Sequence, residues 1–315
     1  MKNYEQRRES MVAFLCQMAN KSLNRIMSNS FNPEREEKQL HRFLESAYEV
    51  SSPQAIAEIY ATFSIFYYAI GRFKKSIEAG EKAAAEVLQS PDLSVKAFLF
   101  RPLSKNAETY HDLGDTLSAL ELTSTLLNTP EYADFRPPLN EMHSLIVNMG
   151  FYHLALEEYE AAEDAFRRVL QLPENVGQEY ANAIADAYRG LSEIYLLKGD
   201  FVNAWTNGRL AYEIAQRQRD PLAWFYANCA MAHIAEQDPN CKAAPESYYA
   251  TTIKTIEQMG TPVLRAVALL HEARFHHRTK NLGRAKQFAA LAANILHDAK
   301  ITAFDPELHH LITAQ

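Results

Sequence analysis

Three histidines lie in the segment from His271 to His277, which reads HEARFHH and resembles a zinc-binding motif. A zinc site of the HExxH type needs two histidines four residues apart, because only that spacing places both rings on one face of a helix. Position 275 is Phe, and the next histidine comes five residues after His271. We therefore expect His271 and Arg274 to lie on a polar helix face, and we expect no metal site there.

A second pair, Cys229 and His233, also has the spacing of one helix face. No further Cys or His pair stands at ligand spacing, so a buried thiol and a hydrogen-bonded histidine are the expected outcome. Neither a glycine-rich phosphate loop nor a GxSxG elbow nor a kinase signature occurs. The sequence therefore predicts no catalytic residues and no cofactor, and the protein is expected not to be an enzyme.

The composition of the chain limits the fold classes and the cellular compartments that are possible for it. The 315 residues carry a formal net charge of −7, which argues against nucleic acid as a partner. No stretch approaches the roughly 18 consecutive apolar residues of a membrane span. Three cysteines are too few for a disulfide framework and indicate a reducing, cytoplasmic compartment. Ten glycines are about 3% of the chain, under half the usual share of about 7%, which disfavours glycine-dependent α/β and all-β folds.

A repeated pattern runs along the chain. Five segments combine the end of an apolar helix, a short turn, an aromatic residue or Leu, and a small residue three positions later. The small residues are Ser76, Ala119, Ala162, Ala204 and Ala285. They are separated by 43, 43, 42 and 81 residues. The last gap is close to two periods, which predicts one degenerate unit.

Each unit is expected to be a helix hairpin. Gly71, Gly114 and Gly199 can take positive φ and end the first helix, and the small residue lets the second helix approach closely. A hairpin leaves one apolar face open, which only a neighbouring hairpin can cover. The predicted fold is all-α, a right-handed α-solenoid of stacked antiparallel hairpins, with the degenerate unit near residues 222–260.

This pattern resembles the tetratricopeptide repeat (TPR). The best matches are Leu191, Tyr195, Gly199, Asp200, Phe201, Ala204 and Ala211, followed by Gly150, Tyr159, Ala162, Phe166 and Pro173. The period is about 42 residues rather than 34, and Ser76 and Ser192 stand where the family prefers Ala and Gly. The longer variant is similar to the repeat arrays of bacterial signalling proteins, which include peptide-pheromone receptors and the sensory halves of some diguanylate cyclases.

Three regions are expected along the chain. Residues 1–52 are predicted to form N-terminal capping helices, split near residues 28–33. Residues 53–300 are predicted to hold about six repeats, and residues 301–315 a C-terminal capping helix that starts at Asp305-Pro306. Pro102 is expected to kink or break the start of its helix.

Aligning the units on their small residues predicts which side chains line a concave inner surface. One row reads Thr62, Lys105, Asn148, Gly190, Asn228 and His271, and nearby rows supply Arg101, Arg189 and Arg274. In the family, Asn, Lys and Arg at such positions often grip peptide backbones and terminal carboxylates. The candidate ligand-binding set is therefore Arg101, Lys105, Asn148, Arg189, Asn228, His271 and Arg274.

The resemblance implies a non-enzymatic regulatory module of a bacterial signalling system that binds a protein or peptide segment, acidic or with a free carboxylate. Two alternatives stay open: the sensory region of a larger signalling enzyme, and a pheromone-type receptor, although residues 1–50 lack a convincing DNA-binding helix-turn-helix. Residues 264–300 carry a local charge of +5, which fits either a solvated hairpin or a docking face for an acidic partner. Association of two chains through an end hairpin is also left open.

Overall fold

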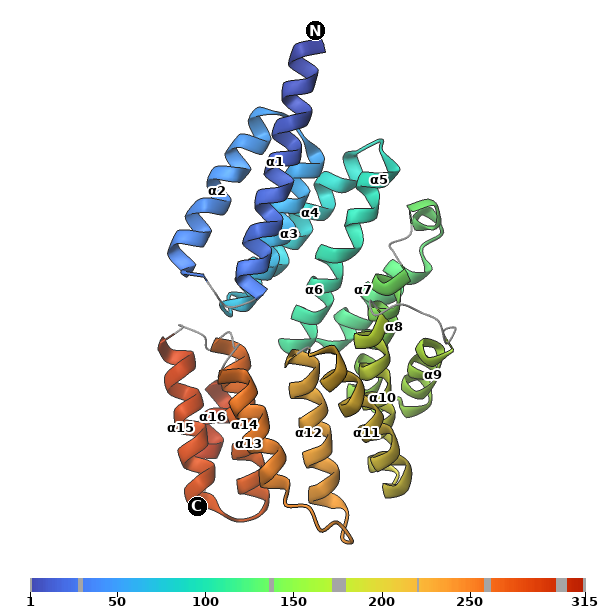
Figure 1. The fold of residues 1–315 in the computed structure, drawn as a ribbon, viewed down its shortest axis with the longest axis vertical. Coiled ribbons are helices and arrows are strands. Elements are labelled where there is room, and N and C mark those ends of the chain that lie inside the picture. Colours follow the sequence, from blue (N-terminus) through green and yellow to red (C-terminus); the bar gives the residue numbers. More distant parts are fainter. Residues whose placement is uncertain are drawn as a thin grey trace. The chain divides into compact units, whose positions relative to one another are not determined.

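The computed structural model describes residues 2–27, 31–135, 139–171, 180–219, 221–257, 262–298 and 305–313. Within these ranges the regular elements are helices, without a β-strand, and no helix is long and apolar enough to cross a bilayer. The chain forms two compact units, Met1–Glu141 (unit 1) and Met142–Gln315 (unit 2). Consecutive helices pair as antiparallel hairpins in each unit (Figure 1), which confirms the all-α prediction.

Unit 1 is built from three helix pairs. Its elements are α1 (Lys2–Met27), α2 (Pro33–Glu49), α3 (Pro53–Ala69), α4 (Phe73–Gln89), α5 (Leu93–Lys96), η1 (Ala97–Leu99), α6 (Phe100–Asp112), α7 (Thr116–Asn128) and η2 (Pro130–Phe135). The long helix α1 packs against both α2 and α3 and buries Leu15 and Ile26 in the same core as Phe66. The predicted N-terminal helix pair is therefore present, while its role as a cap remains a prediction.

The proline at position 102 interrupts the regular helix as expected. The chain passes from α5 through the 3₁₀ turn η1 into α6, and Pro102 lies in the first turn of α6. A proline in the first turn leaves no intrahelical hydrogen bond unmade, whereas further along it would displace one. The proline thus ends the preceding helical segment and starts α6.

Unit 2 consists of four hairpins and a last helix. Its elements are α8 (Leu139–Ala155, which begins just before the division), α9 (Tyr159–Leu170), α10 (Ala181–Leu197), α11 (Phe201–Gln218), α12 (Pro221–Gln237), α13 (Pro245–Glu257), α14 (Pro262–Arg278), α15 (Leu282–Asp298) and α16 (Asp305–Thr313). The pair α12 and α13 is the degenerate unit, and its helices pack as in the regular units. The final helix begins at Asp305 itself, within the usual one-residue uncertainty of helix ends.

Five hairpin turns share one backbone conformation. A residue with positive φ follows the first helix at Gly71, Gly114, Glu157, Gly199 and Lys280. Each donates its N–H to the carbonyl three residues earlier, and the next residue donates to the carbonyl five residues earlier, which is the Schellman motif. These positions repeat the 43-, 43-, 42- and 81-residue spacing, so the period belongs to the turns as well as to the small residues.

The small residues of the second helices lie at a buried contact with the first helices. All five of them are fully buried. Two serines at this contact have hydrogen-bonded hydroxyls. Ser76 Oγ donates to Ser64 O at 2.8 Å, and Ser192 Oγ donates to Ala204 O at 2.9 Å. A buried hydroxyl that finds a carbonyl partner costs little, which explains why serine is accepted at positions where TPR proteins carry Ala and Gly.

The turn after α8 offers a test of this geometry. Glu157 has φ 62°, a conformation that costs an L-residue with a side chain about 1–2 kcal/mol. We expect Glu157→Gly to raise the free energy of unfolding by about 1 kcal/mol, measured by urea denaturation. The matched control Glu160→Gly removes the same charge from a helical position of α9 and should instead lower stability by about 1 kcal/mol. Equal effects of the two variants would contradict the turn assignment.

Candidate functional site

Two of the candidate residues, Arg101 and Lys105, lie one turn apart on α6 in unit 1. Arg101 is exposed. Desolvation raises the pKa of Glu141, and the charge of Arg101 opposes this shift. Lys105 Nζ lies 4.4 Å from the centroid of the Tyr68 ring and also forms an ion pair with Glu108. This lysine is therefore engaged by neighbours on α3 and on its own helix.

Arg189, on α10 of unit 2, is held in a fixed orientation. Its Cζ lies 4.0 Å from the centroid of the Phe151 ring and 5.0 Å from that of Tyr226, so aromatic rings from α8 and α12 both contact the guanidinium. The Nε donates to Asp186 Oδ1 at 3.0 Å. The side chain nonetheless keeps 19% of its surface exposed. Cation–π contacts on two sides immobilise an arginine while leaving its charge in place.

Two histidines lie beside this arginine. The rings of His233, on α12, and His271, on α14, have centroids 5.7 Å apart. Desolvation lowers the pKa of His233 to about 4 and that of His271 to about 3, and the charge of Arg274 lowers both further. Both rings are therefore neutral at pH 7, although both side chains remain partly accessible.

Three arginines act on the histidines. Desolvation contributes most to the lowered pKa of His271, and the charges of Arg274, Arg278 and Arg189 lower this pKa further. Arg278 pairs through its Nε and Nη2 with both oxygens of Glu236, at 2.6 and 2.8 Å. We call the surface formed by Phe151, Arg189, Tyr226, His233, His271 and Arg274 the arginine–histidine face.

The residues of the row predicted to line the inner surface differ in their accessibility. Asn148 and His271 are half-buried, as is Lys105, but Asn228 is only 1% exposed and its Nδ2 donates to Trp224 O of its own helix at 2.8 Å. The expectation that Asn228 lies on an open inner surface is therefore wrong. The connection between α12 and α13, residues 238–244, is longer than the regular three-residue turn and so shifts the expected register. The partly accessible positions of α12 include Tyr226 and His233.

Gly190 does not line an open surface either. A Cβ built on Gly190 would lie 2.2 Å from Cζ of Phe166, so this ring occupies the space beside the glycine. The thiol of Cys229 is buried as expected, and burial raises its pKa to about 12. A protonated thiol is a poor nucleophile, so Cys229 acts here as a packing residue.

Sequence reasoning missed Phe151 and Tyr226 as members of this face. Phe151 and Arg274 occupy equivalent positions six residues before the turn residues Glu157 and Lys280. This shared position in the repeat could have identified Phe151 from the sequence. Tyr226 carried no such signal because its unit lacks the regular turn. Of the basic residues in 264–300, Arg278 is paired with Glu236, and Lys300 lies outside the described residues.

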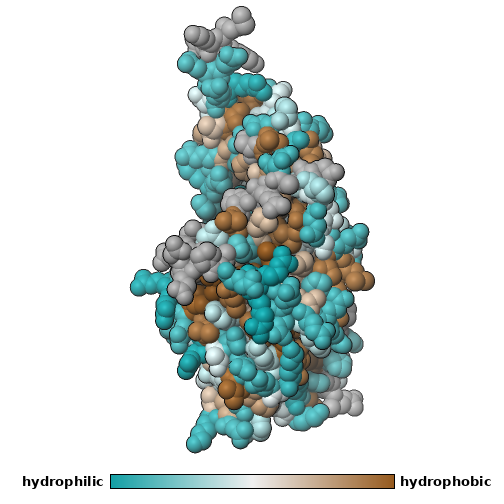
Figure 2. Space-filling model, turned by 90° about the vertical axis from the view of Figure 1, so that its right-hand side faces the viewer, coloured by the Kyte–Doolittle hydropathy of each residue, from teal (hydrophilic) through white to brown (hydrophobic). Residues whose placement is uncertain are grey.

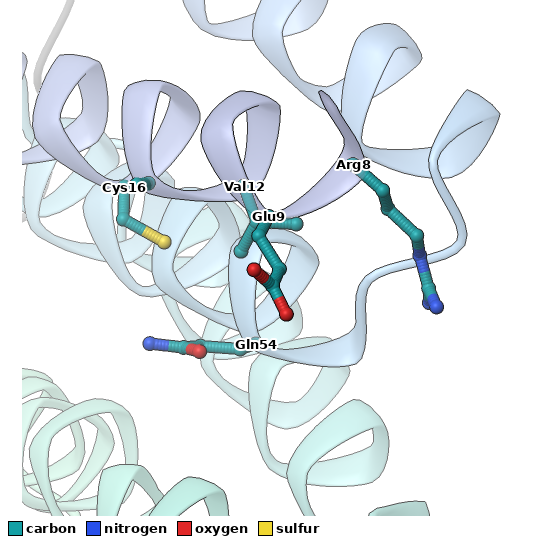
Figure 3. Close-up of a pocket in the computed structure, with 6 residues that line it drawn as sticks. Arg8, Glu9, Val12, Cys16 and Gln54 are labelled. Atoms are coloured by element: carbon teal, nitrogen blue, oxygen red, sulfur yellow. The ribbon is translucent and has the colours of Figure 1, made fainter. Parts of the chain in front are cut away.

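Unit 1 contains a separate cavity of about 370 Å³ between α1 and α3 (Figure 3). Arg8 points away from Cys16 in this view, and its guanidinium donates to the carbonyls of Val50 and Ser51 at 3.0 Å, closing the end of α2. Burial and the nearby Glu58 raise the pKa of Cys16 to about 12. The cavity therefore holds neither a free cation nor a reactive thiol.

The arginine–histidine face combines arginine side chains with aromatic rings and imidazoles. Hydrophilic side chains dominate the face drawn in Figure 2, with apolar side chains between them. No cluster of three or more His, Cys, Asp or Glu residues suited to a metal ion occurs in the described part of the chain. The fixed arginine, neutral imidazoles and rings are suited to binding an anionic or aromatic group.

No protein-family model and no curated protein matches the chain. Solved structures do match it. The apo form of RapI superposes with a TM-score of 0.64 at 13% identity, covering 92% of this chain and 98% of RapI. A Rap protein complexed with Competence and Sporulation Factor gives 0.56 at 17% identity, covering 98% and 95%. A tetratricopeptide repeat protein from Parabacteroides merdae gives 0.54 at 14% identity, covering 96% and 98%. These similarities confirm the predicted architecture: the chain has the helical-repeat fold of TPR-like proteins.

Proposed function

We propose that this chain is a non-enzymatic regulatory module that binds an extended protein or peptide segment on the arginine–histidine face of unit 2. The observation that carries the proposal is the double aromatic contact of Arg189, which fixes a cation on a partly open surface. A fixed guanidinium loses little entropy when it binds a carboxylate. The preferred ligand is therefore a segment with an acidic side chain or a free carboxyl terminus.

Asn148 and the two histidines complete the proposed binding surface. Asn148 is half-buried on α8, the helix that also supplies Phe151. A side-chain amide can donate to and accept from a peptide backbone, while Arg274 adds a second cation on α14. Arg101 and Lys105 belong to unit 1 and stay separate candidates for ligand binding on that unit, and the buried Asn228 is left out.

Two alternatives, a receptor-type role and a sensory region of a larger signalling enzyme, differ in which partner or domain responds to ligand binding. A receptor-type role is favoured by one neighbour of the same fold, the Rap protein that is complexed with Competence and Sporulation Factor. In that role, a ligand that prefers one conformation of the repeats would shift the population toward it. A sensory region of a larger signalling enzyme would use the same face. We place the module in the cytoplasm because its sequence carries few cysteines.

Affinity capture from the native lysate, with the wild-type chain and three variants as baits, tests the proposal. Arg189→Glu should weaken the captured interaction by about tenfold or more, since it replaces the fixed cation by an anion. Asn148→Ala should weaken it about fivefold through the loss of backbone hydrogen bonds. Arg217→Glu makes the same charge change at an exposed site on α11 and should have no effect. A partner that binds all four proteins equally would contradict the assigned site.

A further inference from the structure

The cavity between α1 and α3 of unit 1 is large enough for a small organic ligand. Its volume is about 370 Å³, at the lower end of the range of roughly 300–1,000 Å³ that is usual for ligand sites. Val12 and Ala13 of α1 form an apolar wall, while Glu9 of α1 and Gln54 of α3 add polar groups. In Figure 3 the Glu9 carboxylate points toward Gln54, and the Gln54 side chain extends toward Cys16. The cavity thus combines an aliphatic wall with oxygen atoms that can accept hydrogen bonds.

Gln54 connects this cavity to a buried carboxylate. Its Nε2 donates to Glu58 Oε1 at 3.3 Å, one turn further along α3. Glu58 is only 9% exposed. Desolvation raises the pKa of Cys16 most, and the neighbouring Glu58 raises it further. Since Gln54 and Cys16 both line the cavity and both interact with Glu58, this carboxylate lies directly beside the cavity.

The carboxylate of Glu58 lacks a basic partner. In the described part of unit 1 it forms no ion pair, whereas the other buried glutamate of this unit, Glu36, accepts hydrogen bonds of 2.7 and 3.1 Å from Arg25. Glu9 also forms no ion pair with a described residue, and Arg8, which lines the cavity too, donates to two backbone carbonyls just after α2. A buried carboxylate is stabilised by a cation that hydrogen-bonds to it, and here the described chain does not supply that cation.

We propose that this cavity binds a primary ammonium group carried on a short aliphatic chain. The ammonium donates to the Glu58 carboxylate and to the Gln54 amide oxygen, which is left to accept because the amide nitrogen already donates to Glu58. Glu9 adds a second negative charge, and the aliphatic chain leaves water against Val12 and Ala13. The site lies in unit 1 and does not depend on the function proposed for unit 2.

The probe is n-pentylammonium, and n-pentanol is the neutral control with the same chain. Binding is followed in the full chain through the side-chain amide resonances of Gln54, which are assigned with Gln54→Glu. The ammonium compound should bind with a Kd on the order of 1 mM, and the alcohol at least about tenfold more weakly. Saturating n-pentylammonium should also slow alkylation of Cys16 by iodoacetamide, measured by mass spectrometry, while Cys241 of unit 2 should react at an unchanged rate.

Three glutamate variants locate the charge that the ligand needs. Glu58→Gln should weaken n-pentylammonium binding about tenfold, because it removes the buried charge and keeps the shape of the side chain. Glu9→Gln should weaken it about threefold, since this carboxylate is exposed. Glu45→Gln makes the same change at an exposed position of α2 and should leave the affinity unchanged.

Three results would overturn the ammonium site. They are equal affinities for n-pentylammonium and n-pentanol, an unchanged affinity in Glu58→Gln, and a Cys16 alkylation rate that the ammonium compound does not alter. Should Glu58→Gln fail to fold, Glu9→Gln decides the matter, because an exposed side chain tolerates the change. An affinity in Glu9→Gln equal to that in Glu45→Gln would then contradict the proposal.

Discussion

Replacement of Phe166 by alanine is expected to lower the free energy of unfolding by about 4 kcal/mol. Phe166, on α9, is completely buried, and its ring lies between two glycines of the neighbouring first helices. A Cβ built on Gly150 of α8 or on Gly190 of α10 would lie 2.6 or 2.2 Å from ring carbons. Removal of the ring leaves a cavity that these helices can fill only by moving. Since α8 and α10 carry Phe151 and Arg189, partner binding should weaken as well.

The glycines supply the complementary experiment. Gly190→Ala should cost about 2–3 kcal/mol, because overpacking against Phe166 exceeds the roughly 1 kcal/mol that alanine gains in helix propensity. The same substitution in a Phe166→Ala background should cost little or nothing, which gives a large coupling energy. Gly283→Ala on α15 is the control, because a Cβ there meets no atom within 4 Å. Both tryptophans, Trp205 and Trp224, lie in unit 2, so urea unfolding followed by their fluorescence reports on this unit. Equal costs for Gly190→Ala and Gly283→Ala would refute the interlocked packing.

Acidification from pH 7 to about pH 5 is expected to destabilise unit 2 by about 2 kcal/mol. His233 and His271 have folded-state pKa values of about 4 and about 3, below the value of about 6.5 for an unfolded histidine. Between these values the unfolded chain binds more protons than the folded chain. Their contribution to stability is therefore complete above about pH 6.5 and is lost as the pH falls toward the folded values. The expected change in the free energy of unfolding is smaller than the sum for two fully buried histidines, because both rings are partly exposed.

The histidine variants identify the source of this pH dependence. His233→Asn and His271→Asn should each flatten the decline in the urea midpoint between pH 7 and about pH 5, and together they should remove most of it. Glu193 acts in the opposite direction, because its raised folded pKa favours the folded state as the pH falls. The comparison of wild type with the double variant cancels that contribution. An unchanged decline in the double variant would show that other groups carry it.

The repeat architecture was predictable because its signals are local. Glycine at 71, 114 and 199 marks turns with positive φ, and the chain adopts that conformation at all three. The buried small residues follow from the same register. The turns at Glu157 and Lys280 were visible only through spacing, since neither residue type favours the left-handed conformation. There the tertiary packing of each hairpin imposes the backbone geometry.

The functional face was less predictable because it depends on contacts between units. Arg189 and Arg274 were found through their residue type, but the rings that hold Arg189 come from helices before and after its own. The register of α12 could not be read because residues 238–244 replace the regular three-residue turn between α12 and α13. Asn228 was therefore placed on the surface although it is buried. Segment binding by Asn148, Arg189, His271 and Arg274 remains a prediction, as do the boundaries of the capping regions.

Site-specific photocrosslinking measures most directly whether a segment lies on the arginine–histidine face. A photoreactive phenylalanine derivative at Tyr226 keeps an aromatic ring beside Arg189, and the same group at Arg209 is exposed on α11. With the native lysate, the group at position 226 should crosslink a single segment whose yield falls in an Arg189→Glu background, and the group at position 209 should not capture that segment. Crosslinking of the partner from position 209 alone, or from position 226 with no dependence on Arg189, would contradict the account.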